Sequence, residues 1–88
     1  MTTYRQIGAT IRHATTDFFE VTKDDGTVYN VTVSWSEFQG TTVQVERVLE
    51  RTAAHTHARA EDPEEFAQSL GFEHEFDLAE HLVEEVAQ

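Results

Sequence analysis

The sequence contains no cysteine and only one proline, one lysine and one tryptophan in 88 residues. Without cysteine, the chain can form neither disulfides nor thiolate metal sites, so its fold depends on a noncovalent core. Uninterrupted apolar stretches never exceed three residues, whereas a membrane-spanning helix needs about 20. The first residues also lack the apolar run of a signal peptide. The sequence therefore predicts a cytoplasmic protein that does not contact membranes.

The last 29 residues, 60–88, lack lysine and arginine altogether but carry ten carboxylates. The first 59 residues carry seven carboxylates and all six basic residues, so the net charge of −11 divides into −1 and −10. The step from Ala67 to Gly71, followed by a second amphipathic segment, is similar in spacing to a helix-turn-helix. DNA affinity comes largely from basic side chains that neutralise phosphates. The charge of this segment therefore argues against DNA binding, and we interpret it as a structural pair of helices.

Lysine is scarce, while threonine is abundant, with twelve residues. This acidic composition resembles that of cytosolic proteins from salt-loving archaea, although it points to no particular family. At about 1 M salt the Debye length falls to about 3 Å, so neighbouring carboxylates repel each other much less than in dilute buffer. The composition therefore predicts a salt-adapted protein.

Alternating apolar and polar residues predict a β-hairpin with strands at residues 18–23 and 28–35. Asp25 and Gly26 lie between them, and this dipeptide favours tight hairpin turns because glycine adopts positive φ without strain. An earlier strand at residues 4–13 is favoured over a helix, since that segment contains poor helix formers. Together these segments predict an antiparallel meander of about three strands.

Apolar residues recur at helical spacing after Gly40 and predict a helix over residues 42–57. A strand through Val43 and Val45 is the competing interpretation. Two further helices are expected over residues 63–70 and 77–87, the first opened by a capping aspartate and a proline. The sequence therefore predicts a single α+β domain, residues 1–88, in which the meander packs against these helices.

Several aliphatic and aromatic side chains are expected to form the core. Val45, Val48 and Leu49 on the helix at 42–57 are the candidates for packing on Val31 and Val33. Trp35 and Phe38, at the exit of the strand at residues 28–35, are also expected to be buried, and an exposed aromatic patch for a partner is the alternative.

Histidine is frequent for a chain with so few other basic residues, and His55 and His57 are the candidate metal ligands. On a helix, however, residues two apart do not share a face. A zinc site also needs at least three protein ligands, and no third ligand is evident in the pattern. Metal binding through this pair is therefore the second alternative function.

A nucleic-acid surface is the first alternative. Basic and aromatic residues of the predicted sheet could together form a stacking platform for single strands. The candidate residues are Tyr4, Arg5, Arg12, Lys23 and Tyr29.

Sequence motifs of catalysis are absent, including nucleophile elbows, phosphate-binding loops and dinucleotide fingerprints. Most carboxylates fall on predicted solvent faces, where their acidity is not tuned for proton transfer. The leading hypothesis is therefore a non-enzymatic protein without a cofactor, which acts by protein–protein interaction with another protein or as a homodimer.

Overall fold

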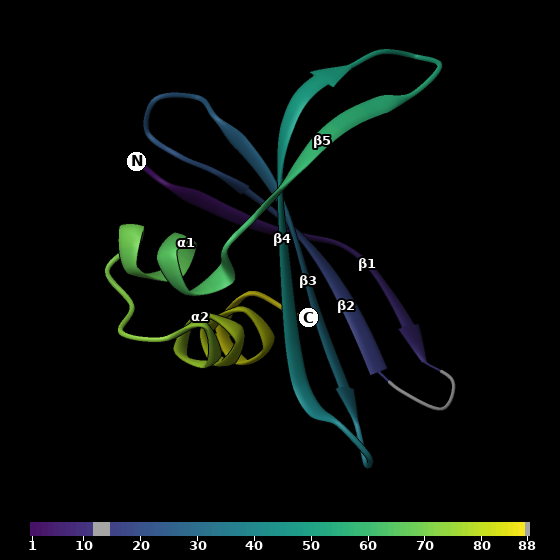
Figure 1. Ribbon diagram of the computed structural model, residues 1–88, viewed down its shortest axis with the longest axis vertical. Coiled ribbons are helices and arrows are strands. Elements are labelled where there is room, and N and C mark those ends of the chain that lie inside the picture. The colour runs from purple at the N-terminus through teal and green to yellow at the C-terminus, as the bar shows by residue number, and fades with distance from the viewer. Residues whose placement is uncertain (12–14, 88) are drawn as a thin grey trace.

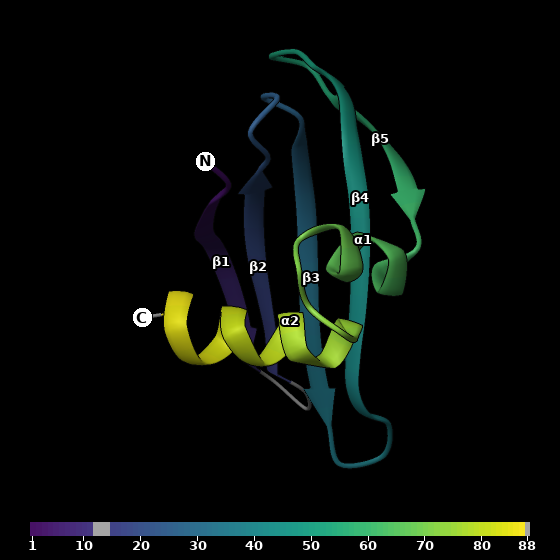
Figure 2. The ribbon, with the colours of Figure 1, turned by 90° about the vertical axis from the view of Figure 1, so that its left-hand side faces the viewer.

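The computed structural model describes residues 1–11 and 15–87. The fold is α+β, and the chain forms one antiparallel sheet in which each strand pairs with the next along the sequence. In the part of the chain that the structure describes, three short helical segments follow the sheet, the last being a π-helical turn that continues α2. In Figure 1 the helices lie on one side of the sheet, and Figure 2 shows α2 running across the strands. The elements are β1 (Thr3–Ile11), β2 (Thr15–Thr22), β3 (Val28–Ser36), β4 (Gly40–Arg51), β5 (Thr56–Glu61), α1 (Pro63–Ser69), α2 (Glu75–His81) and η1 (Leu82–Val86).

The predicted hairpin is confirmed as β2 and β3. Gly26 has φ of 88° in the turn, and the side chain of Asp25 accepts a hydrogen bond from the Thr27 amide at 2.9 Å. The strand predicted at residues 4–13 is confirmed as β1 over the part that the structure describes. Residues 12 and 13 lie outside the described residues.

The helix predicted over residues 42–57 is wrong. These residues form most of β4, a turn and the start of β5, so within residues 1–11 and 15–87 the sheet has five strands instead of about three. Val43 lies opposite Val33 and Val45 lies opposite Val31. These cross-strand pairs bury β-branched side chains that favour strands over helices.

The pairing of β4 with β5 is irregular near the end of β4. The pairing of β4 with β5 shifts register between Val48 and Glu50, and such a bulge places one extra residue on one strand. The helical spacing of the apolar residues in β4 does not mark one buried face, because Val45 is 3% exposed whereas Leu49, four residues later, is 58% exposed.

The core lies between the helices and one face of the sheet. Each strand of the central three contributes two side chains to it, and Phe19, Val21 and Val31 are almost fully buried. Burial of one such side chain stabilises the fold by about 1.5–3 kcal/mol. Val45 is buried, but as a strand residue opposite Val31 and not on a covering helix. Val48 is outside the core and Leu49 is exposed, so the expected packing of these two residues is wrong. The buried residues are Phe19, Val21, Val31, Val33, Val43, Val45, Phe66, Ala67, Leu78, Ala79 and Leu82.

Both C-terminal helices follow the sequence pattern closely. The Asp62 side chain accepts hydrogen bonds from the amides of Glu64 and Glu65 at 2.8 and 3.1 Å, which caps α1 at its start. The second helix begins at Glu75, two residues earlier than predicted, and buries Leu78 against the sheet. None of the helices in the described part of the chain is long and apolar enough to cross a membrane.

Candidate functional site

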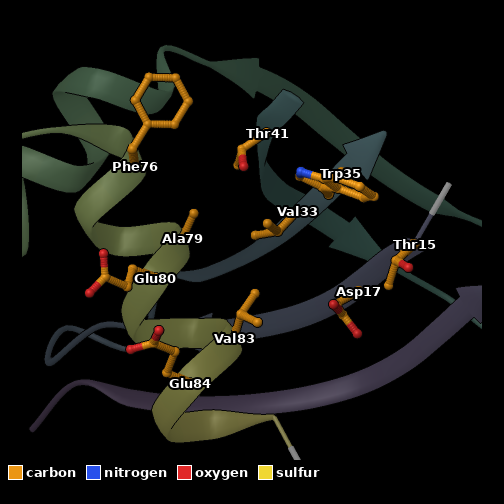
Figure 3. A pocket seen from close by; sticks show the side chains of 10 residues that line it. All are labelled: Thr15, Asp17, Val33, Trp35, Thr41, Phe76, Ala79, Glu80, Val83 and Glu84. Atoms are coloured by element: carbon orange, nitrogen blue, oxygen red, sulfur yellow. The ribbon is translucent and has the colours of Figure 1, made fainter. Parts of the chain in front are cut away.

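A cavity of about 560 Å³ opens where α2 and η1 cross the ends of β2, β3 and β4. Figure 3 shows Ala79 and Val83 projecting from the helix towards Val33 on β3. Trp35 lies further along the same strand, and Phe76 lies at the other side of the opening. We call this cavity the groove. Its lining residues are Thr15, Asp17, Val33, Trp35, Thr41, Phe76, Ala79, Glu80, Val83 and Glu84.

Large apolar side chains of the groove remain exposed to solvent. Trp35 is 53% exposed, Phe76 54% and Val83 42%. Burial of Trp35 was expected and is wrong, because β3 extends past the part of the sheet that the helices cover. Phe38, in the turn between β3 and β4, is 95% exposed and so is not a core residue either.

Carboxylates form the polar part of the groove. Asp17, Glu80 and Glu84 contribute acidic groups, and none of the described lining residues is basic. Asp17 accepts a hydrogen bond from the Gln6 side chain at 3.1 Å. Within residues 1–11 and 15–87, these carboxylates form no salt bridge. The groove therefore combines aromatic surface with negative charge that the described residues do not neutralise.

The candidate nucleic-acid residues do not share one surface. Tyr4 faces the helices, where its ring meets the His81 ring at 5.2 Å, and burial raises the pKa of its hydroxyl. Arg5 follows it in β1 and therefore points to the opposite face, where its guanidinium lies 3.0 Å from the Glu20 carboxylate. Arg12 lies outside the described residues.

The other two candidates are engaged with α1. Tyr29 packs its ring 4.5 Å from that of Phe66. Lys23 donates a hydrogen bond to the Ser69 hydroxyl at 2.7 Å and places its ammonium 5.3 Å from both rings. These contacts hold the β2–β3 turn against the first helix. The nucleic-acid hypothesis stays a prediction, without a shared platform of these residues to support it.

The structure brings the two candidate metal ligands together. His55 precedes β5 and His57 belongs to it, and their ring centroids lie 4.6 Å apart. The objection that residues two apart diverge applied to a helix, whereas in extended backbone they lie on one side. No group of three or more His, Cys, Asp or Glu residues able to hold a metal occurs in the part of the chain that the structure describes.

Two other histidines have structural contacts. His74 Nδ1 lies 2.7 Å from Glu64 Oε1; the hydrogen bond and the charge of Glu64 raise the pKa of His74, and the same hydrogen bond lowers the pKa of Glu64. The His81 ring contacts those of Tyr4 and Phe72, with centroids 5.2 and 5.5 Å apart. Both residues connect elements of the fold.

Sequence reasoning missed the groove. Its one visible signal was the continued alternation from Val33 to Trp35, which placed the indole on the apolar face without showing where the helices end. Comparisons with protein-family models, with curated proteins and with solved structures found no match to this chain.

Proposed function

We propose that this chain is a salt-adapted, cytoplasmic, non-enzymatic interaction domain that binds a cationic, amphipathic segment of another protein in the groove. The observation that carries this proposal is the exposure of Trp35 and Phe76 beside three carboxylates. Aromatic side chains that become buried at the centre of an interface contribute a large share of binding energy. A groove of this kind offers such anchors together with a defined charge.

Charge complementarity selects the partner's chemistry. Apolar residues of the partner would cover Val83 and Phe76, and its lysine or arginine side chains would reach the carboxylates of the groove. A cation can also lie over the indole of Trp35, an interaction worth about 0.5–1 kcal/mol at an exposed site. At about 1 M salt long-range attraction is lost, but partly buried pairs at contact distance are screened less.

The same charges disfavour a second copy of this chain as the occupant. In a two-fold dimer the same patch occurs on both subunits, so Asp17, Glu80 and Glu84 would face the equivalent carboxylates. Like charges brought together in this way weaken association. A basic partner is therefore a better occupant of the groove than a second copy of this chain.

A pair of probe peptides tests the proposal directly. One is a helical peptide with leucines on one face and lysines on the other; its control replaces every lysine with glutamate. In concentrated KCl we expect the lysine peptide to shift the amide resonances of Trp35, Phe76 and Val83, and the glutamate peptide to leave them unchanged. Equal binding of both peptides would refute the charge selection.

Two matched variants locate the binding site. Phe76→Ser removes an exposed apolar side chain from the groove, and Leu49→Ser removes one of similar exposure (58%) from β4 outside it. We expect the first variant to weaken binding of the lysine peptide at least tenfold and the second to leave it unchanged. Unchanged binding by Phe76→Ser would show that the groove is not the docking surface.

A further inference from the structure

The β4–β5 hairpin presents two imidazoles side by side. The rings of His55 and His57 have centroids 4.6 Å apart and planes inclined by 46°, and both residues are exposed. The backbone of His55 is held in place by Thr52, whose hydroxyl accepts a hydrogen bond from the His55 amide at 3.2 Å and donates one to its carbonyl at 3.1 Å. The turn therefore fixes the backbone of His55, and His57 follows in β5, where it lies opposite Glu50.

Neither ring has another interaction in the described structure. The side chains of His55 and His57 form no hydrogen bond or ion pair with residues 1–11 or 15–87. In contrast, His74 is hydrogen-bonded to Glu64, and His81 contacts two aromatic rings. Within the described residues, the two imidazoles thus make no contact that would give them a role in stabilising the fold. Neutral imidazole is a common ligand for zinc.

Two imidazoles alone do not complete a zinc site. Structural zinc takes four ligands and catalytic zinc three from the protein, and the described residues offer no group of three. The missing ligands would have to come from a second molecule. The hairpin of a second copy of this chain supplies two more imidazoles, which completes the four ligands of a tetrahedral zinc site.

The position and charge of the hairpin suit such a pairing. β5 is the last strand of the sheet, so its outer edge pairs with no strand among the described residues, and Figure 1 shows the hairpin extending away from the helices. Residues 46–59 contain three arginines and two glutamates. Two copies that each carry a net charge of −11 would therefore meet here with less repulsion than at the helical end.

We propose that His55 and His57 form half of an intermolecular zinc site, in which one Zn²⁺ joins two copies of this chain through four imidazoles. The site lies beyond the proposed function. The hairpin is at the Arg51 end of β4, whereas the groove is at the Thr41 end. A metal-linked dimer would thus leave both grooves accessible, and would present two of them to a partner.

Zinc titration of the metal-free protein tests this proposal. We expect calorimetry to give one Zn²⁺ per two chains, and sedimentation to show a monomer that becomes a dimer with zinc and returns to monomer with EDTA. His55→Ala and His57→Ala should each abolish the zinc-dependent dimer. His74→Gln is the matched control, because it removes an exposed imidazole outside the hairpin, and it should dimerise like the unaltered chain.

Three results would overturn the proposal: no zinc binding, one zinc bound per monomer, or zinc-dependent dimers that persist in both hairpin variants. Circular dichroism of each variant checks that a lost dimer does not reflect a lost fold. The lysine-peptide titration in His57→Ala separates this site from the groove. The His57→Ala variant should still bind the peptide. The zinc site and the peptide-binding groove are therefore tested independently of each other.

Discussion

The Nδ1 atom of His74 lies 2.7 Å from Oε1 of Glu64 and so ties the start of α2 to the first turn of α1. A second contact supports the same junction, since the Glu75 amide donates a hydrogen bond to the other oxygen of Glu64 at 3.2 Å. Asp77 in turn accepts a hydrogen bond from the His74 amide at 3.2 Å. The two helices are thus joined by one carboxylate that accepts from both an imidazole and an amide.

This junction predicts a pH window of stability. The pKa of His74 is raised from 6.5, so its contribution is complete below pH 6.5 and is lost as pH rises through the folded-state pKa. The pKa of Glu64 is lowered from 4.5, so its contribution is present above pH 4.5 and is lost as pH falls through the folded-state pKa. The pair should therefore stabilise the fold most between pH 4.5 and 6.5.

Denaturation of the unaltered chain and of His74→Gln across pH measures this effect. We expect the difference in unfolding free energy to be largest inside the window and to shrink on both sides. In a Glu64→Gln background, the same His74→Gln change should show little pH dependence. A difference that stays constant from acid to alkaline pH would contradict the assignment.

Val45 and Leu49 distinguish the observed strand from the helix that the sequence suggested. Val45 is 3% exposed and Leu49 58%. Val45→Thr buries a hydroxyl without an evident partner and should cost about 1–3 kcal/mol of unfolding free energy. Leu49→Thr should change it by less than about 0.5 kcal/mol. Urea denaturation measures both, and comparable losses would favour a helix that buries both side chains.

The first half of the sheet was predictable because its signals are local. Alternation defines β2 and β3, and Asp25 with Gly26 defines the turn between them. Helix α1 was equally accessible, since Asp62 and Pro63 mark its start. In these segments the local pattern favours a single secondary structure, and the final structure has that one. Tertiary contacts were therefore not needed to decide between helix and strand.

β4 was not predictable from its own pattern. Apolar residues from Val45 onward recur at helical spacing, and only pairing with β3 shows that Val43 and Val45 belong to a sheet. The pairs Val33–Val43 and Val31–Val45 are 10 and 14 positions apart in the sequence. The periodicity within a single segment contains no information about such pairs. The error carried over to the candidate site, since a helix over residues 42–57 would have separated His55 from His57 and covered Trp35.

Trp35 provides a direct optical check of the groove, because it is the only tryptophan. Because 53% of the Trp35 surface is exposed, the folded protein should show red-shifted tryptophan emission and strong acrylamide quenching. Both should be close to the values of the urea-unfolded chain. Binding of the lysine peptide should shift the emission to shorter wavelength and reduce quenching. Blue-shifted, protected emission in the free protein would mean that the indole is buried.

Salt should stabilise the helical end more than the sheet. Glu80 in α2 and Glu84 in η1, which continues it, are four residues apart, and a like-charge pair at this spacing costs about 0.2–0.5 kcal/mol when unscreened. Residues 60–88 carry ten carboxylates without lysine or arginine, so repulsion there extends beyond this pair. Because about 1 M salt reduces the Debye length to about 3 Å, the melting temperature should rise with KCl.

Hydrogen exchange in dilute buffer should locate the weak region. Amides of α1 and α2 should exchange before those of β2 and β3, and added KCl should reduce the difference. Glu80→Gln should lessen the dependence of the melting temperature on KCl. Glu37→Gln is the matched control, since Glu37 is exposed in the β3–β4 turn away from the helices, and it should leave that dependence almost unchanged. A melting temperature independent of KCl would show that carboxylate repulsion does not limit this fold, and would remove the physical basis for salt adaptation.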